Sequence, residues 1–224
     1  MLTLRVWIFV MVFISFAGFS CSRSNPTNQA VPNPAKDLIT SNGGTSQAKR
    51  TAVFAGGCFW CTEAVFEQLV GVTDVISGYA GGTMESAKYD LVARGSTDHA
   101  EVIQVTYEPD KISYGQLLKV FFTVAHDPTQ LNRQGPDTGR QYRSAVFYVE
   151  EEEKTVSESY IRQLEEAEIF SDPIVTTLEP LNHFYPAEDY HQDYVRLNPS
   201  QPYVVYNALP KVKKVRDKYS GQVR

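Results

Sequence analysis

The chain is poor in the residues that would place it in several common functional classes. Among 224 residues it has only three cysteines and four histidines, with no second cysteine pair and no histidines at ligand spacing, so a structural zinc site is not indicated. The formal net charge is -5, and the sequence has neither an internal repeat nor a glycine-rich phosphate-binding fingerprint. We therefore expect no nucleic-acid partner, no metal and no bound cofactor.

Long apolar runs are also scarce. One uncharged apolar run, residues 6–19, follows a single positive charge at Arg5 and is too short for a comfortable membrane span, so it fits the hydrophobic region of an export signal. Cys21 then stands where a bacterial lipoprotein signal would be cut and acylated, although the residues before it fit that motif imperfectly. An ordinary cleaved signal, an uncleaved anchor and a cysteine of no consequence are the alternatives. We expect residues 1–21 to direct export to the cell envelope or periplasm, with Cys21 as a candidate lipidation site.

Residues 22–50 differ in composition from the rest of the chain. They are dominated by Ser, Asn, Pro, Gly, Thr, Gln and Ala, which offer almost nothing to a core, and this predicts a flexible linker. The whole chain is 42% hydrophobic and 12% aromatic, which suits one medium domain with a sizeable core. We place that domain at residues 51–224.

The order of predicted elements indicates the fold class. Residue periodicity and turn formers predict strands at 51–55, 73–79, 101–107, 144–149 and 174–178, and helices at 63–69, 113–124, 152–167 and 187–197. This order predicts an α+β two-layer sandwich with a mixed sheet and a ferredoxin-like core with additions. The polar stretch 125–143 is long for a loop in a compact domain, which favours a functional role. The basic tail 211–218 is expected to be solvated.

A pair of cysteines lies directly after the first predicted strand. Cys58 and Cys61 flank the aromatic residues Phe59 and Trp60, two glycines before them permit a tight turn, and the apolar residues after them have helical spacing. Cys58 is therefore expected at a helix N-terminus, where the dipole favours a thiolate, although by only about 0.3–1 kcal/mol. Positions i and i+3 share a helix face, so a small shift brings Cys61 within disulfide reach of Cys58.

Such a pair can attack either a disulfide or a sulfoxide. Disulfide exchange needs no acid beyond solvent, whereas a sulfoxide oxygen leaves only when it is protonated and the methylthio group must be held against an apolar surface. Phe59 and Trp60 could wall such a pocket, or they could simply be core residues. A thiol–disulfide oxidoreductase of the cell envelope, and a non-enzymatic lipoprotein in which the cysteines form a structural staple, are the alternatives left open.

Several segments resemble the A-type peptide methionine sulfoxide reductases, over about residues 52–199. They are Gly57-Cys58-Phe59-Trp60, Gly78-Tyr79-Ala80-Gly81-Gly82, His99-Ala100-Glu101-Val102, His126-Asp127-Pro128-Thr129-Gln130, residues 135–144 and Ala187-Glu188-Asp189-Tyr190-His191-Gln192. The resemblance implies reduction of methionine S-sulfoxide, free and in proteins, and so a role in repair of oxidised proteins. It also implies that a thioredoxin-like dithiol supplies the electrons without a bound cofactor.

The resemblance implies a role for each matching residue. It makes Cys58 the nucleophile and Glu101 the acid that protonates the sulfoxide oxygen, although Glu101 alone could be a solvated strand residue. The other implied groups are Phe59 and Trp60 as the methyl-binding wall, Tyr89 and Tyr142 as hydroxyls that bind the oxygen, Asp137 as a residue that positions substrate and loop, and His191 and Tyr194 as supporting groups.

The chain departs from a common family pattern in its recycling cysteine. Family members often carry resolving cysteines in a glycine-rich tail, but no cysteine follows Cys61 here. Recycling must then use Cys61 or an external thiol, and the resemblance to the Cys-Phe-Trp-Cys variant of the family points to Cys61. We expect a monomer that acts on oxidised proteins and free methionine sulfoxide, and that touches a membrane only through an N-terminal lipid.

Overall fold

The structure is a computed structural model that describes residues 30–38 and 48–224. The expected export signal, residues 1–21 with Cys21, and most of the expected linker lie outside the described residues. Within the described ranges, no helix has both the length and the apolar character needed to cross a membrane.

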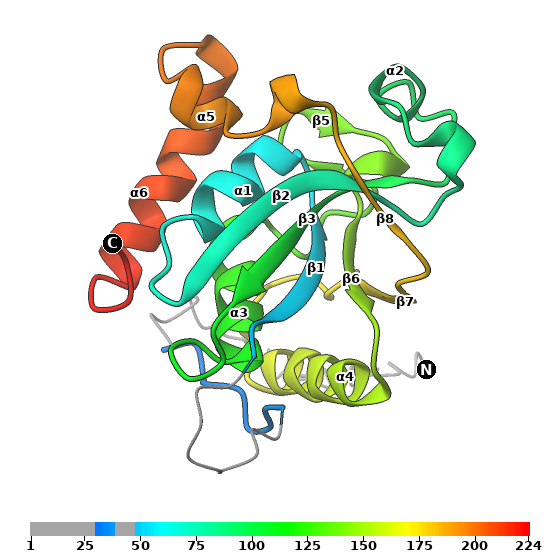
Figure 1. Ribbon diagram of the computed structural model, residues 1–224. Coiled ribbons are helices and arrows are strands. Elements are labelled where there is room, and N and C mark those ends of the chain that lie inside the picture. Colours follow the sequence, from blue (N-terminus) through cyan, green and yellow to red (C-terminus); the bar gives the residue numbers. More distant parts are fainter. Residues whose placement is uncertain (1–29, 39–47) are drawn as a thin grey trace, which may run out of the picture.

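A six-stranded sheet forms the centre of the molecule (Figure 1). Its strand order is β7-β6-β1-β3-β2-β8, and every neighbouring pair is antiparallel except β6 and β7, which are parallel. The predicted α+β class with a mixed sheet is thus confirmed. The six strands are β1 (Arg50–Gly56), β2 (Val72–Ala80), β3 (Ala100–Tyr107), β6 (Ser144–Tyr148), β7 (Thr177–Pro180) and β8 (Phe184–Pro186).

Helices and short turns connect these strands, and a small hairpin lies in the predicted functional loop. The hairpin consists of β4 (Arg133–Gln134) and β5 (Asp137–Thr138). The α-helices are α1 (Phe59–Phe66), α2 (Tyr89–Val92), α3 (Tyr114–Val120), α4 (Glu151–Glu166), α5 (Tyr194–Leu197) and α6 (Leu209–Lys218). Two π-helical turns, at Phe121–Ala125 and Val204–Ala208, and three 3₁₀ turns, at Met84–Ser86, Arg140–Tyr142 and Asp189–His191, complete the fold.

The two faces of the sheet bury very different amounts of apolar surface. Alternation along β1 points Phe54 to one face, where its ring stacks at 5.5 Å on Phe66 of α1 and at 5.0 Å on Phe121. Side chains of α1, α3, α4 and α6 complete this large core. The opposite face carries a small cluster that includes Ala55 and Phe147. The packing of α1 in this large core therefore fixes the cysteines against one face of the sheet.

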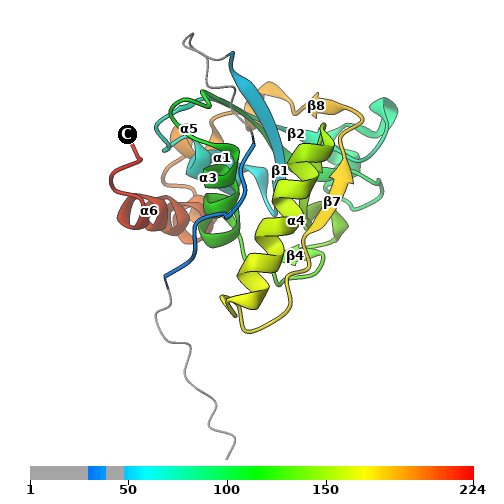
Figure 2. The ribbon, with the colours of Figure 1, turned by 90° about the horizontal axis from the view of Figure 1, so that it is seen from below.

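Residues 30–38 refine the expectation that the stretch 22–50 is a flexible linker that offers almost nothing to the core. This segment runs along α3 and α4 (Figure 2), and Leu38 at its end is buried, with 6% of its surface exposed. The Asp37 carboxylate accepts hydrogen bonds from the Ser113 hydroxyl and from the Gly115 N–H at 2.9 Å, at the N-terminus of α3. The segment is therefore held by a helix-capping carboxylate, by the apolar side chains Val31 and Leu38 and by hydrogen bonds to α4, which composition alone did not reveal.

Two other expectations near the C-terminus need correction, and a third holds for most of its residues. The strand predicted at 174–178 begins only at Thr177. The helix predicted at 187–197 is two short turns, because Asp193 between them has a left-handed backbone with φ of 56°. The basic tail lies within α6, where Lys213, Lys214, Arg216 and Lys218 are exposed as expected, whereas Lys211 is half-buried and Val215 is completely buried.

Candidate active site

The chain turns sharply from β1 into α1 and places Cys58 at the helix N-terminus, as predicted. Gly57 has φ of +83°, and a Cβ built there would lie 2.4 Å from Cβ of Gln134, so only glycine fits. The Cys58 carbonyl accepts the first helical hydrogen bonds, from the N–H groups of Cys61 at 3.1 Å and Thr62 at 3.4 Å. Cys58 and Cys61 are thus one helical turn apart.

Both cysteines are buried and carry free thiols, and the two side chains lie close enough for each to shift the pKa of the other. Burial raises the pKa of Cys58 well above its usual value, and the proximity of Cys61 and Glu101 acts in the same direction. The pKa of Cys61 is lowered, chiefly by the hydrogen bond from Cys58 and also by the positive charge of Lys211. Burial therefore outweighs the helix dipole at Cys58, contrary to the thiolate expected from the dipole.

Glu101 lies on β3 beside the start of α1. One of its carboxyl oxygens, Oε2, accepts a hydrogen bond from the Phe59 N–H at 3.1 Å, and the side chain is buried. Burial raises the pKa of Glu101 to about 8, and the negative charge of Asp137 adds to this effect. The carboxyl group is therefore protonated near neutral pH. The hydrogen bond from Phe59, the residue after Cys58, holds it beside the turn that carries the cysteines.

Aromatic residues surround the same turn. The Trp60 indole N–H donates to Nδ1 of His191 at 3.1 Å, and its ring stacks on Tyr194 at 3.7 Å. The Phe59 ring lies 5.0 Å from the His191 ring and is only 1% exposed, so Phe59 is also part of the core. The Tyr89 ring lies 4.3 Å from the same histidine. His191 thus connects three of the predicted aromatic groups.

The two predicted oxygen-binding tyrosines lie close to the acid and the nucleophile. Burial, together with the proximity of Glu101 and Cys58, raises the pKa of Tyr89 to about 12. Burial also raises the pKa of Tyr142, with Glu101 as the next cause. Glu188 holds Tyr89 in place by accepting its backbone N–H at 3.0 Å. Both hydroxyls stay protonated at neutral pH and can donate hydrogen bonds.

On the Cys61 side, the site includes residues that the sequence did not single out. A cavity of about 40 Å³ is lined by both cysteines together with Gln134, Gly135, Pro136, Asp137, Tyr203, Asn207 and Lys211. The Tyr203 hydroxyl donates to Oδ2 of Asp137 at 2.5 Å, and the Cys61 Sγ lies 4.0 Å from the same hydroxyl. Nothing in one sequence distinguishes Tyr203 from the other tyrosines, and Lys211 belonged to the tail that was expected to be solvated.

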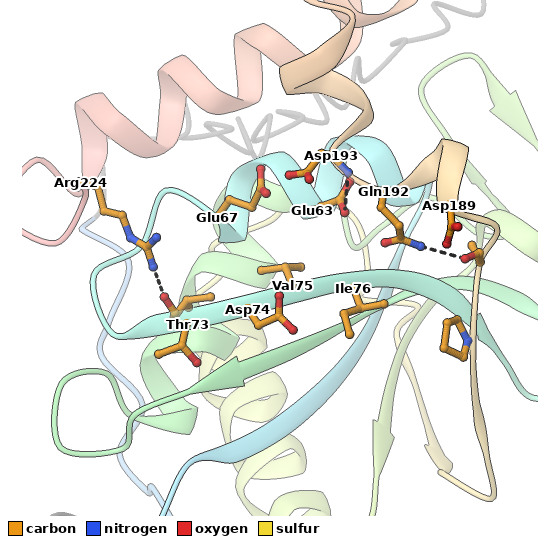
Figure 3. A pocket seen from close by; sticks show the side chains of 13 residues that line it. Glu63, Glu67, Thr73, Asp74, Val75, Ile76, Asp189, Gln192, Asp193 and Arg224 are labelled. Atoms are coloured by element: carbon orange, nitrogen blue, oxygen red, sulfur yellow. Dashed lines mark hydrogen bonds between the residues drawn. The ribbon is translucent and has the colours of Figure 1, made fainter.

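The predicted residues converge on this one region. Of the predicted site residues, all but Cys21 are described, and they lie around the N-terminal turn of α1. A separate groove of about 400 Å³ lies along α1 and β2, with Glu63, Glu67, Asp74 and Asp193 among its lining residues (Figure 3), and it does not include the cysteines. Among the described residues, no cluster of histidine, cysteine, aspartate and glutamate could hold a metal ion.

Comparison with known proteins identifies the family. Residues 50–223 match the family described as peptide methionine sulfoxide reductase. The chain is 51% identical over 200 residues to peptide methionine sulfoxide reductase MsrA 2 of Synechocystis sp., covering 89% of this chain and 93% of that protein. It is 55% identical over 162 residues to a protein of the same name from Mesorhizobium japonicum, covering 72% and 83%.

Solved structures agree with this match. The structure of Mxr1 from Saccharomyces cerevisiae in reduced form has a TM-score of 0.63 and 36% identity, covering 68% of this chain and 87% of that one. Methionine sulfoxide reductase A of Corynebacterium diphtheriae has a TM-score of 0.60 and 33% identity, covering 76% and 84%. With the matching segments gathered around Cys58 and Glu101, the chain belongs to the peptide methionine sulfoxide reductase family, A type.

Proposed function

We propose that Cys58 is the nucleophile with which this methionine sulfoxide reductase attacks the sulfoxide sulfur, and that Glu101 is the acid that protonates the departing oxygen. The observation that carries this proposal is the hydrogen bond from the Phe59 N–H to Glu101, which fixes a carboxyl group with a pKa of about 8 beside the cysteine turn. A protonated acid of this kind is what a sulfoxide needs and a disulfide does not. The site thus favours the reductase over the thiol–disulfide oxidoreductase and the structural staple.

The first half of the reaction balances within the site. Glu101 gives its proton to the sulfoxide oxygen, and the Cys58 thiol passes its own proton to Glu101 as its sulfur attacks. The oxygen ends on Cys58 as a sulfenic acid and methionine leaves, so Cys58 is oxidised and the substrate sulfur is reduced. Because burial raises the pKa of Cys58, its thiol loses the proton during the attack and not before it.

Cys61 completes the cycle in this proposal. Its thiol condenses with the sulfenic acid to form a Cys58–Cys61 disulfide and water, and a thioredoxin-like dithiol then reduces the disulfide. The position of Cys61 one helical turn from Cys58, in a shared cavity, supports this role. The substrate is the S-epimer of methionine sulfoxide, free or in proteins, with Phe59 and Trp60 as the methyl-binding wall and Tyr89 and Tyr142 as donors to the oxygen.

The proposal extends to the setting of the enzyme. The apolar run at residues 6–19 supports export to the cell envelope or periplasm, with Cys21 as a candidate lipid anchor. We propose that the enzyme acts as a monomer. The order β6-β1-β3-β2 with α1 and α3 between strands supports a ferredoxin-like two-layer core to which the outer strands are added. Mass spectrometry of the mature N-terminus would test the anchor.

Single-turnover assays on separated sulfoxide epimers test the function. Wild type and Cys61→Ser should each yield about one methionine per enzyme from the S-epimer without reductant, whereas Cys58→Ser should yield none, because a neutral hydroxyl is not a nucleophile toward sulfur at neutral pH. Methionine production by Cys58→Ser at the wild-type rate would rule out the assignment.

A further inference from the structure

Tyr203 links Cys61 to a carboxylate. The Cys61 thiol donates to the Tyr203 hydroxyl, with 4.0 Å between the sulfur and the oxygen. The Tyr203 hydroxyl in turn donates to Oδ2 of Asp137 at 2.5 Å. The three groups line the same small cavity as Cys58. The chain of donors therefore runs from the second cysteine, through one tyrosine, to a half-buried acid on the β4–β5 hairpin.

The surroundings of Tyr203 hold it in this position. Its ring meets the Trp60 ring edge-on at 6.0 Å, and Asn207 one turn later donates to its backbone carbonyl at 3.0 Å. Lys211 lies on the wall of the same cavity, with its ammonium group donating to the Ala125 carbonyl at 2.7 Å. A fixed positive charge beside Cys61 stabilises a developing thiolate there.

We propose that Tyr203 and Asp137 form the proton relay of the resolving step, in which Cys61 attacks the sulfenic acid of Cys58. This inference rests on the proposed role of Cys61. The S–S bond forms as the Cys58 S–O bond and the Cys61 S–H bond break. Tyr203 takes the thiol proton while giving its own to Asp137, and the departing hydroxide takes the proton of Glu101 and leaves as water. The proton gained by Asp137 then passes through solvent to Glu101, so the step releases no net proton. The Cys61 sulfur is oxidised to the disulfide level and the Cys58 sulfur is reduced to it.

Burial of Asp137 is consistent with this role. Burial raises the pKa of its carboxyl group, which makes it a better proton acceptor than an ordinary surface aspartate, and it lies opposite the positive charge of Lys211 and close to Glu101. Tyr203 itself stays protonated, because burial and the neighbouring thiols raise its pKa. It can therefore pass a proton on without being a lasting anion.

Tyr203→Phe tests the relay, because it removes the hydroxyl and keeps the ring on Trp60. The full chain is mixed with free methionine S-sulfoxide, quenched at intervals, and analysed for methionine and for the Cys58–Cys61 disulfide. We expect disulfide formation to slow on the order of 10²-fold, with sulfenic acid accumulating on Cys58, while methionine formation slows far less. Tyr206→Phe is the matched control, because Tyr206 lies in the following π-helical turn and is 79% exposed.

Two results would overturn the relay: disulfide formation in Tyr203→Phe at the wild-type rate, or equal slowing of both steps, which a structural role would give. Cys61→Ser separates this failure from failure of the proposed function. If Cys61→Ser still turns over with a dithiol protein at the wild-type rate, Cys61 is not the resolving thiol and the relay falls with it.

Discussion

Two carboxyl groups near the cysteines have pKa values displaced in the same direction by burial. Glu101, at about 8, is fully enclosed beside the Phe59 N–H, whereas Asp137 is half-buried and accepts from Tyr203. Glu101 is bonded to the Phe59 N–H that follows Cys58, and Asp137 is linked through Tyr203 to Cys61, so we propose that the first acid serves the sulfoxide oxygen and the second the resolving thiol. The division of labour thus depends on position and burial and not on residue type.

The raised pKa of Glu101 gives a prediction for pH dependence. With protonated Glu101 as the proposed acid, kcat/KM of the wild type should fall as pH rises through about 8. Glu101→Gln should lower the rate on the order of 10²–10⁴-fold and remove this fall, as measured between about pH 6 and 9. A glutamine variant that works at the wild-type rate would place the acid elsewhere.

The two aromatic residues of the motif should respond differently to truncation. Phe59 is 1% exposed, so Phe59→Ala should lower the free energy of unfolding by about 3–5 kcal/mol. Trp60 is half-buried and stacked on Tyr194, so Trp60→Ala should chiefly raise KM for the sulfoxide, by several-fold. Urea unfolding and steady-state kinetics measure the two effects. If Trp60→Ala loses stability but keeps its KM, the ring serves packing alone.

At the level of elements, α1 carries reactive or titratable groups in two places. Its first turn carries the cysteines, while Glu63, further along, is 2% exposed and accepts a hydrogen bond from the Asp193 N–H at 3.2 Å. Burial raises the pKa of Glu63 from 4.5 to about 8, and that of neighbouring Glu67 to about 7. A carboxyl group of this kind binds its proton more tightly in the folded state than in the unfolded state.

This linkage makes stability depend on pH. The contribution of Glu63 is fully present below about pH 4.5 and is lost as pH rises to about 8, because only the unfolded state releases the proton in that range. Glu63→Gln should therefore gain on the order of 1–3 kcal/mol over wild type at pH 9 relative to pH 5, in urea titrations. Exposed Glu166→Gln is the control, and an equal effect in both variants would mean that Glu63 ionises normally.

Much of this element order was open to prediction from the sequence, because apolar periodicity marks the strands β1, β2, β3 and β6 and the helix α4. The edges were not. Burial of a few apolar side chains decides whether the tail 211–218 is solvated or packed, and local propensity does not report it. Tyr203 was missed for a related reason: its role depends on the fold bringing it to Cys61, 142 positions earlier.

At the level of the whole molecule, the domain begins earlier than composition indicates. Residues 30–38 contact α3 and α4. Gln163 of α4 accepts a hydrogen bond from the Ala35 N–H at 2.9 Å and donates one to the Asn33 carbonyl at 2.7 Å. The described part of the expected linker is thus bound to the domain.

Leu38→Ala tests whether this attachment stabilises the domain. The side chain is 6% exposed, so its truncation should lower the free energy of unfolding by about 2–4 kcal/mol without changing single-turnover methionine formation. Lys36→Ala, at an exposed position of the same segment, should change stability little. Equal stability of Leu38→Ala and wild type would show that the segment is dispensable for the fold.

The central claim is that the sulfoxide oxygen ends on Cys58. Peptide-mapping mass spectrometry of Cys61→Ser after one turnover with methionine S-sulfoxide tests it most directly, because this variant cannot convert the sulfenic acid to the Cys58–Cys61 disulfide. We predict one added oxygen atom on the peptide that contains Cys58, in an amount equal to the methionine released. Methionine released while Cys58 remains an unmodified thiol would contradict the account.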